Sequence, residues 1–544
     1  MAPKNIADTL AAIALHYGSK TGLIEARSGR SLSFFELDQN ARRYASLLSE
    51  HGVGEGDRVI MMIRPSADFI SLAFALFRLG APVILIDPGM GYHNVLRCIE
   101  AVKPDYLIGI PPAILLSRLF PGPFRTIRKR FSFGFIPGLA AGDIRKQALR
   151  HGSVEHPEFS PRDNSLAAII FTTGSTGPPK GVRFEHTIFA AQLEHIKSFY
   201  GIGPGDIDQP GFPLFALFSA ALGATAVIPD MDPTRPAQVN PQLFVDSINR
   251  YGVTYSFGSP AIWHVVSSYC LTHARSCPTL KKVLMAGAPV SGELVEKVAK
   301  IISSDGEIHT PYGATESLPI VSIEGKEIVG QTWQQTRRGK GTCVGRPLPG
   351  ISVKVIECSN EAFSSLSSCR ELPPGEIGEI IVCGDVVTRA YENNDPETFF
   401  SKIPDGSGFW HRLGDVGYYD EQGRLWFCGR KTHRVHARNG ILYSICCEAV
   451  INVHPDVFRS ALVGVDDDQG WEIPVIIIEM EKPARRKKEA VVSEVRDLAA
   501  GHPLTKEIKQ VLVHSSFPLD IRHNAKIFRE KLKIWAQRRL PRNQ

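Results

Sequence analysis

Residues 171–182 read FTTGSTGPPKGV, a stretch with four hydroxyl side chains, three glycines and one lysine. The apolar run 166–171 leads into it and predicts a buried strand. Glycines let a backbone come close to a ligand, and successive N–H groups in such a loop form a concave anion site. The hydroxyl groups and the lysine add further donors. The stretch therefore predicts a polyphosphate-binding loop formed by Thr172, Thr173, Gly174, Ser175, Thr176, Gly177 and Lys180.

This loop is not a Walker A motif. Counted from Gly174, the pattern GxxxxGK[ST] requires glycine at 179 and serine or threonine at 181, where the chain has Pro179 and Gly181. The sequence therefore disfavours the phosphoryl transfer of P-loop kinases and GTPases.

Length and composition indicate a soluble protein with several structural units. The chain has 544 residues, of which 43% are hydrophobic and 22% charged, values that are ordinary for globular proteins. Its length corresponds to about three or four units of ordinary domain size. The net charge of +6 is mild, and no basic run alternates with aromatic residues, so no nucleic-acid partner is expected.

Cysteine usage and the apolar segments bear on where the protein is found. Ten cysteines occur without a CxxC pair, which argues against a zinc site or a disulfide framework and favours reduced thiols. The first residues lack the apolar segment of a signal peptide. The longest uncharged stretch, 209–229, contains prolines and glycines and is interpreted as a buried strand–helix segment, not as a transmembrane segment. We therefore expect a cytoplasmic protein.

Helix and strand periodicities alternate along most of the chain, which favours layered α/β structure. Helices are predicted at 34–51, 67–79, 241–249, 261–269 and 292–303, and strands at 58–63, 82–86, 255–257 and 282–285. Residues 344–427 combine short strands with turn pairs and predict a β-rich subdomain. A boundary near 429–432 precedes a small α/β unit. Residues 111–150 are apolar and basic and are interpreted as a surface insertion that contacts a partner or a membrane, or as an irregular connection.

Four further segments carry charged or hydroxyl side chains at predicted turns. Residues 312–316 read YGATE, and a carboxylate beside a bound triphosphate is a natural ligand for Mg²⁺. Residues 411–415 read HRLGD, and the final acid suits the hydroxyl groups of a ribose. Residues 429–431 read GRK and add a cation, and residues 522–526 read RHNAK and place a lysine on a loop. Considered alone, each of these residues has an ordinary structural explanation. Asp415 would stabilise a turn, Glu316 would be an acid at a helix N-terminus, and Lys526 would be a solvated lysine.

In this order and spacing, the segments resemble the adenylate-forming superfamily of acyl-activating, AMP-binding enzymes, which includes acyl-CoA synthetases and beetle luciferases. The resemblance covers nearly the whole chain and includes 286–289 (AGAP) and 375–379 (GEIGE). It implies an α/β fold with a large N-terminal adenylation domain (1–428), a hinge (429–433) and a small, mobile α+β C-terminal lid (434–544). The β-rich subdomain of about 344–427 belongs to the large domain.

The resemblance also implies a role for each candidate residue, with ATP and Mg²⁺ as cofactors. The loop from Thr172 to Lys180 would hold the phosphates, Thr315 would contact phosphate and Glu316 would bind Mg²⁺. Asp415 would hold the ribose hydroxyls with help from Arg430. The adenine and ribose side would further include Gly287, Ala288, Pro289, Tyr312 and Gly313. Lys526, on the lid, would bridge the substrate carboxylate and the α-phosphate in the transition state.

The chain departs from the common acyl-CoA synthetase pattern at several positions. Lys431, Thr432 and His433 follow the hinge arginine, where an acid is usual, and no acid occurs before Glu448. Ala216 follows the PLF run in place of a histidine or an aromatic residue, and Ala525 replaces the glycine before the lid lysine. The segment 435–440 also differs from the usual glycine-rich form. These differences argue against rotation of the lid into a CoA-accepting state.

The segments 429–440, 447–465 and 520–532 resemble one branch, the β-lactone synthetases of bacterial long-chain olefin biosynthesis. That resemblance implies ATP-dependent closure of a 2-alkyl-3-hydroxy fatty acid to a β-lactone, with release of AMP and pyrophosphate. It also implies a condensing enzyme, a reductase and a β-lactone decarboxylase as pathway partners. Two alternatives stay open: a long- or medium-chain fatty acyl-CoA synthetase, and a nucleotide-binding scaffold without catalysis.

Overall fold

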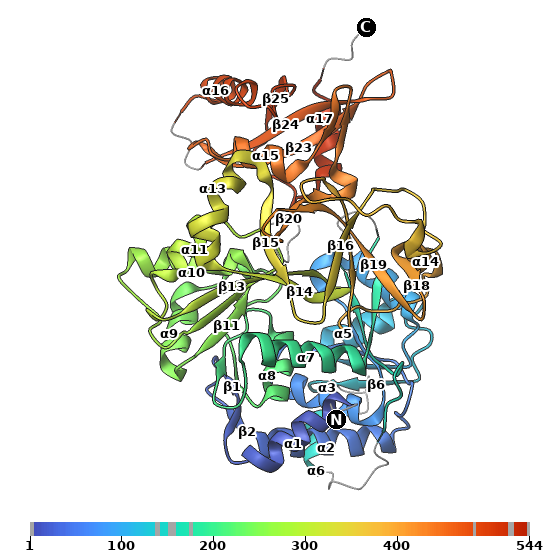
Figure 1. The fold of residues 1–544 in the computed structure, drawn as a ribbon. Coiled ribbons are helices and arrows are strands. Elements are labelled where there is room, and N and C mark those ends of the chain that lie inside the picture. The colour runs from blue at the N-terminus through green and yellow to red at the C-terminus, as the bar shows by residue number, and fades with distance from the viewer. Residues whose placement is uncertain are drawn as a thin grey trace.

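The computed structural model describes residues 5–136, 142–150, 159–172, 178–481, 486–519 and 527–540 (Figure 1). The N-terminal helices form the base of the molecule, two large sheets form its middle, and the C-terminal elements lie at the opposite end. The helices among the first 150 residues are α1 (Ile6–Tyr17), α2 (Phe34–Glu50), α3 (Ala67–Leu79), α4 (Tyr92–Val102), α5 (Pro111–Leu119) and α6 (Ile144–Arg150), of which α1, α2, α3 and α6 lie at the base (Figure 1).

A six-stranded sheet carries the predicted phosphate loop. Its strands, in spatial order, are β6 (Lys129–Ser132), β5 (Tyr106–Gly109), β3 (Val59–Met62), β4 (Val83–Leu85), β7 (Leu166–Phe171) and β8 (Gly181–Glu185). All pairs are parallel except the last, because β7 and β8 are joined by the loop itself. Side chains alternate between the two faces. Val59 and Val83 face one core, whereas Ile60 and Ile84 face another.

The larger sheet has 14 strands among the described residues. Its mainly parallel part consists of β9 (Ile207–Asp208), β10 (Thr225–Ile228), β11 (Tyr255–Gly258), β12 (Lys282–Met285) and β13 (Glu307–Ala314), with β1 (Thr21–Glu25) and β2 (Ser31–Ser33) at the edge. Its antiparallel part consists of β14 (Ser317–Glu324), β15 (Thr342–Pro347), β16 (Ser352–Ile356), β17 (Gly378–Cys383), β18 (Lys402–Asp405), β19 (Gly408–Tyr419) and β20 (Leu425–Arg430). The antiparallel part coincides with the β-rich texture predicted for 344–427.

Helices cover the larger sheet and join its two parts. They are α7 (His186–Tyr200), α8 (Ala216–Leu222), α9 (Pro241–Tyr251), α10 (Pro260–Thr272), α11 (Gly292–Ala299), α12 (Gly325–Glu327), α13 (Trp333–Gln335) and α14 (Asp395–Ser401). The helix α7 crosses the middle of the molecule between the two sheets (Figure 1).

The C-terminal part is a small α/β unit with its own apolar cores. A sheet of β23 (Val457–Asp466), β24 (Glu472–Met480) and β25 (Gln510–Val513) packs with α15 (Ser444–Ile451), α16 (Lys488–Ala500) and α17 (Arg529–Gln537). The hairpin β21 (Val435–Ala437) and β22 (Gly440–Leu442) precedes it. A single helical turn, Lys431–His433, links this unit to β20. The division into two mobile bodies at this turn stays a prediction.

Most predicted helices and strands are confirmed, and one interpretation is wrong. Residues 111–136 are not an irregular connection, because α5 and β6 lie there and β6 pairs with β5 in register. The sequence analysis missed these two elements because the residues Pro121, Gly122 and Pro123 between them are typical of irregular loops. The uncharged stretch 209–229 forms α8 and β10, as expected for a buried strand–helix segment. In the described residues, no helix has both the length and the hydropathy that a bilayer crossing requires.

Candidate active site

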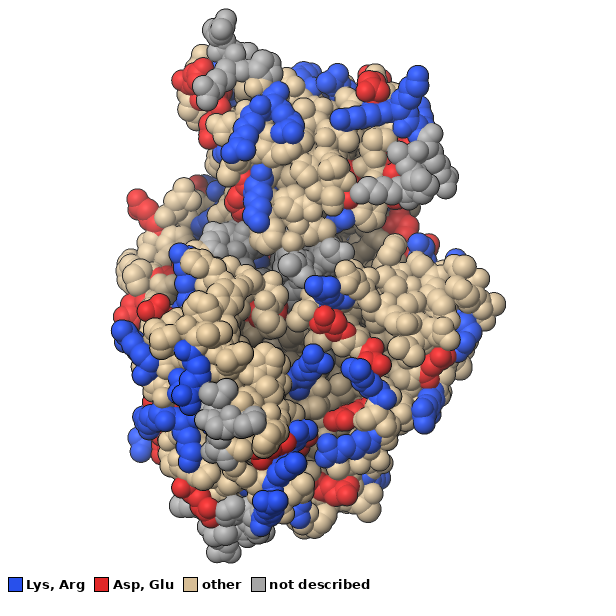
Figure 2. All heavy atoms as spheres, turned by 180° about the vertical axis from the view of Figure 1, so that it is seen from behind, with Lys and Arg blue, Asp and Glu red and all other residues tan. Residues whose placement is uncertain are grey.

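One cavity of about 750 Å³ brings the predicted site residues together. It lies where the carboxyl ends of β7, β11 and β12 meet the start of β14, the edge at which α/β sheets bind ligands. Seen from behind, the molecule is hollowed between its lower and upper parts (Figure 2). The predicted residues that line the cavity are Thr172, Lys180, Gly287, Ala288, Pro289, Tyr312, Gly313, Thr315, Glu316, Asp415 and Arg430.

Six of the predicted residues lie outside the described part of the chain. They are Thr173, Gly174, Ser175, Thr176, Gly177 and Lys526. The flanking residues Thr172 and Lys180 line the cavity on one side, and Ile527 and Arg529 line it from the C-terminal part. The roles of these six residues stay predictions.

The predicted ribose end is a buried, charged cluster built by three strands. Asp415 on β19 lies opposite Arg430 on β20, and the carboxylate and guanidinium are 2.9 Å apart. Arg430 also donates to the Leu413 carbonyl, and the Tyr312 hydroxyl donates to the second Asp415 oxygen at 2.6 Å. The Asp415 charge raises the pKa of Arg430, and burial together with the same charge raises that of Tyr312. Asp415 is thus fixed as an acceptor at the cavity wall.

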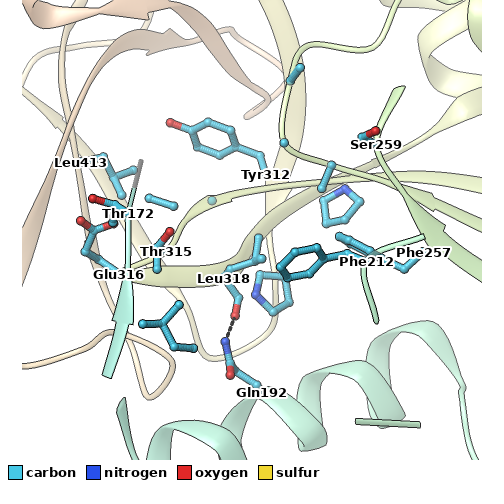
Figure 3. Close-up of a pocket in the computed structure, with 18 of the residues that line it drawn as sticks. Thr172, Gln192, Phe212, Phe257, Ser259, Tyr312, Thr315, Glu316, Leu318 and Leu413 are labelled. Atoms are coloured by element: carbon cyan, nitrogen blue, oxygen red, sulfur yellow. Dashed lines mark hydrogen bonds between the residues drawn. The ribbon is translucent and has the colours of Figure 1, made fainter. Parts of the chain in front are cut away.

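The predicted metal ligand, Glu316, lies at the turn between β13 and β14. The Tyr391 hydroxyl donates to a Glu316 carboxylate oxygen at 2.7 Å, and the Thr388 N–H donates to the Glu316 carbonyl at 2.9 Å. Burial, followed by the Glu316 charge, raises the pKa of Tyr391. The Thr388 bond fixes the backbone of Glu316, the Tyr391 bond positions its carboxylate, and both Glu316 and Thr315 line the cavity (Figure 3).

A single oriented carboxylate fits a nucleotide-bound Mg²⁺. This ion takes one or two protein carboxylates and fills its remaining positions with phosphate and water oxygens. Within the described residues, no group of three or more His, Cys, Asp or Glu could hold a metal without a substrate. The single carboxylate of Glu316 therefore suits a Mg²⁺ ion that binds together with a nucleotide.

Lys180 is held beside Glu316 by residues that sequence reasoning missed. The Thr172 N–H donates to the Lys180 carbonyl, and the Lys180 N–H donates to the Thr172 hydroxyl. These two hydrogen bonds join the residues at the two ends of the predicted phosphate loop. The Lys180 ammonium pairs with Glu397 and lies 5.5 Å from the centre of the Tyr391 ring. Tyr391 and Glu397 come from a segment more than 200 residues away, where the sequence shows only a polar turn before a helix. A phosphate that binds Lys180 would compete with Glu397.

Burial lowers the pKa values of two ionisable groups near Glu316. Burial lowers the pKa of Lys402 to about 7, although the charges of Glu316 and Glu185 oppose this shift. Its ammonium donates to the Thr388 carbonyl. Burial also lowers the pKa of His411 well below its ordinary value, and its Nδ1 lies 3.3 Å from the Ser401 carbonyl. His411 therefore serves packing at this position and carries no charge near neutral pH.

The rest of the cavity is apolar and follows α7. Phe189, Gln192, Ile196 and Tyr200 line it and recur at helical spacing, so the cavity extends over about 16 Å of this helix. Phe215 stacks on Phe257 at 4.0 Å between ring centres. Figure 3 shows Phe212 and Phe257 next to Leu318, whose carbonyl accepts a 2.7 Å hydrogen bond from the Gln192 amide. A long alkyl chain fits such a channel, whose upper end meets Thr315 and Glu316.

The turn that joins the two parts of the chain is anchored by a buried acid. The Lys431 ammonium lies 3.0 Å and 3.2 Å from the two Glu379 oxygens, which Arg412 also contacts at 2.6 Å and 3.2 Å. His433 contacts Glu530 of α17 at 3.1 Å. Glu379 of β17 thus holds Lys431, the first residue after Arg430, against the antiparallel part of the large sheet. The resulting contacts tie the turn to the large domain on one side and to the C-terminal unit on the other.

This fold and this site define an adenylate-forming enzyme, which joins a carboxylate to the AMP portion of ATP. Residues 7–392 match the model of the AMP-binding enzyme family. The chain is 43% identical to the olefin beta-lactone synthetase of Xanthomonas campestris pv. campestris over 93% of its own length and 91% of the relative's. It is 42% identical to the protein of that name from Stenotrophomonas maltophilia K279a, over 94% and 92% of the two chains. The chain belongs to the AMP-binding enzyme family.

More distant matches separate the two enzymatic readings of the sequence. The long-chain-fatty-acid–CoA ligase of Thermus thermophilus is 23% identical over 88% of this chain and 87% of its own. Among solved structures, an anthranilate CoA ligase in complex with anthranoyl-AMP superposes with a TM-score of 0.81 at 18% identity, over 99% of this chain and 98% of that chain. The acyl-CoA synthetase reading therefore rests on distant relatives, which share the fold.

Proposed function

We propose that the protein is an ATP-dependent β-lactone synthetase that closes a 2-alkyl-3-hydroxy fatty acid. The observation that carries this proposal is its likeness, over nearly the full length of both chains, to two enzymes named olefin beta-lactone synthetase. The apolar cavity along α7 supports a long-chain acid, because it opens beside Thr315 and Glu316.

In the first step, a carboxylate oxygen of the acid attacks the α-phosphorus of ATP and pyrophosphate leaves. Both reactants are anions, so cations and N–H dipoles aimed at the developing charge lower the barrier. Lys180 and the loop from Thr172 would hold the phosphates, Lys526 would contact the attacking carboxylate and the α-phosphate, and Asp415 with Arg430 would hold the ribose. Glu316 would hold Mg²⁺, which neutralises phosphate charge when bound.

In the second step, the oxygen of the substrate's 3-hydroxyl attacks the activated acyl carbon. A carbon–oxygen bond closes the four-membered ring, the bond from the acyl carbon to the phosphate oxygen breaks, and the hydroxyl proton passes to the departing AMP. The nucleophile belongs to the same molecule, so it acts at a high effective concentration and no second substrate has to be positioned. The buried pair of Lys431 and Glu379 supports this reading, because it holds the turn against β17 and would oppose a further rotation of the lid into a CoA-accepting state.

The proposal also covers the domains of the chain, its location and its partners. Residues 434–544 would close over residues 1–428 about the hinge at 429–433, and Lys526 would reach the site only in the closed arrangement. The protein would act in the cytoplasm beside a condensing enzyme, a reductase and a β-lactone decarboxylase.

The test is product analysis with purified protein, ATP, Mg²⁺ and a racemic 2-alkyl-3-hydroxy acid, with and without CoA. We expect a β-lactone and AMP in both mixtures, and pyrophosphate exchange that Lys526→Ala abolishes. The matched acid without its 3-hydroxyl should be adenylated but give no lactone. Acyl-CoA without lactone would establish the acyl-CoA synthetase alternative. Absence of pyrophosphate exchange with either acid would establish a scaffold without catalysis.

A further inference from the structure

The segment that contains α5 has a surplus of positive charge. Residues 91–136 carry seven Lys and Arg against two acids, a net charge of +5. The basic residues are Arg97, Lys103, Arg118, Arg125, Arg128, Lys129 and Arg130. The left side of the rear view in Figure 2 shows more blue than red side chains. This segment folds as α4, β5, α5 and β6.

The helix α5 turns apolar side chains to the outside. Its inner face, with Ala113 and Ile114, is buried against the six-stranded sheet. Leu115 and Leu119 lie four residues apart on the outer face and are 48% and 64% exposed. A helix on the surface of a globular protein usually has polar residues there. The outer face of α5 therefore carries leucines at positions where a solvent-exposed helix usually has polar residues.

Aromatic residues extend this apolar surface at both ends of the helix. The Phe120 ring lies 5.1 Å from that of Tyr92, and both side chains are exposed. At the other end Phe135 is 75% exposed, and its neighbour Gly134 lies against the Pro111 ring. We call the surface formed by Tyr92, Leu115, Leu119, Phe120 and Phe135, with the exposed Arg118 and Arg125, the α5 face. Five of the 17 large apolar side chains exposed in the described residues belong to it.

The α5 face is separate from the active site. Ile114 of α5 packs in one core with Ile60 and Ile84, on one side of the six-stranded sheet. The cavity is lined by Met61 and Val83, whose side chains belong to the core on the other side. Substitutions on the outer face of α5 therefore leave the cavity walls in place.

We propose that the α5 face docks on an anionic lipid surface. A cluster of large exposed apolar side chains on one face of a protein marks an interaction site. Leucine and aromatic side chains beside arginines are the composition of segments that lie in the interface of a bilayer, where each basic residue near anionic headgroups strengthens binding by about fivefold. A two-chain acid, the substrate class proposed above, resides in such a bilayer. The docking itself does not depend on that proposal.

Vesicle flotation with the full chain tests the docking. The probes are vesicles of phosphatidylcholine alone and of phosphatidylcholine with 30% phosphatidylglycerol, at low and high salt. We expect binding to the anionic vesicles only, weakened by salt. The variant L115S/L119S/F120S should lose at least about tenfold in affinity, whereas L15S/L271S/I534S, with equally exposed positions elsewhere, should bind as the parent does. The variant R118E/R125E should lose affinity for anionic vesicles by a similar factor, whereas K506E/K509E should bind them as the parent does.

Pyrophosphate exchange with a short, water-soluble acid shows that each variant is folded, since no substituted residue lines the cavity. The proposal is overturned if the parent protein ignores anionic vesicles or if L115S/L119S/F120S binds them undiminished. It is also overturned if the parent chain is a dimer that the same variant converts to a monomer, because the α5 face is then a protein interface. If the parent protein binds anionic vesicles but forms no lactone, that result contradicts the proposed function and leaves the docking proposal in place.

Discussion

The Tyr391 hydroxyl donates a 2.7 Å hydrogen bond to Glu316, and the Tyr391 ring lies under the Lys180 ammonium at 5.5 Å. One side chain therefore positions both the proposed metal ligand and the cation of the phosphate loop. It reaches them because the backbone of Tyr391 pairs with Val182, two residues beyond Lys180.

Tyr391→Phe should lower kcat for adenylation by about tenfold and raise the Mg²⁺ concentration needed for half the maximal rate. A hydrogen bond to a charged group contributes about 1.5–3 kcal/mol, and its loss lets the carboxylate rotate. The ring stays beneath Lys180, so the KM for ATP should change little. Pyrophosphate exchange measured over a range of Mg²⁺ concentrations checks this. Tyr419→Phe removes a hydroxyl that bonds the Val353 carbonyl outside the site and should have no effect on either quantity.

Asp415→Asn should raise the KM for ATP by about tenfold or more and abolish the preference for ATP over 2′-deoxy-ATP and 3′-deoxy-ATP. The amide is a weaker acceptor for ribose hydroxyls than a carboxylate, and Arg430 loses its ion pair. A residue that only supports the fold would alter the rates with all three nucleotides equally. Unchanged discrimination in the variant would therefore remove Asp415 from the ribose site. Tyr312→Phe, which deletes one donor to Asp415, should show the same trend at smaller size.

Where local signals are strong, the sequence predicted the fold closely. The helix α3 begins and ends at the predicted residues, because Ser66 caps its first turn and Gly80 ends it with a positive φ of 65°. The predicted helix 292–303 is too long. The helix α11 ends at Ala299, and the chain continues as a turn in which the Ile301 N–H donates to the Val298 carbonyl at 3.0 Å. The strand β6 was not predicted, because it exists only through its pairing with β5.

The site shows a similar division. Residues within compact motifs, such as Thr315 and Asp415, are where the motifs placed them along one cavity. Tyr391 and Glu397 were missed because their roles depend on contacts with Glu316 and Lys180 that only the folded chain creates. The turn after β20 gives the clearest case. The sequence showed that Lys431 follows Arg430, but not that Glu379 of a distant strand pairs with it.

Glu379→Gln should destabilise the protein by about 3–5 kcal/mol, because it leaves the buried Arg412 and Lys431 facing a neutral amide. Lys431→Met should cost less, about 1–3 kcal/mol, because Arg412 still pairs with the acid. It should also increase proteolytic cleavage between the two parts of the chain. Urea unfolding and limited trypsin digestion check both. Lys354→Met removes a partly exposed partner of Glu371 and should change stability by less than about 1 kcal/mol. Equal losses for Glu379→Gln and Lys431→Met would contradict this account.

His186 should make the protein less stable as the pH falls from about 6.5 to 4. Its ring is buried between Phe77 and Phe159, and burial lowers its pKa from 6.5 to about 4. Between these values the unfolded chain binds a proton that the folded chain does not, so acid favours unfolding, and the effect is complete below pH 4. The full contribution is about 3 kcal/mol, of which about 2 kcal/mol is lost by pH 5. His186→Phe should remove this part of the slope when urea unfolding is compared at pH 7.5 and 5, whereas His16→Gln, at an exposed position, should leave the slope unchanged. A slope that persists in His186→Phe would place the responsible group elsewhere.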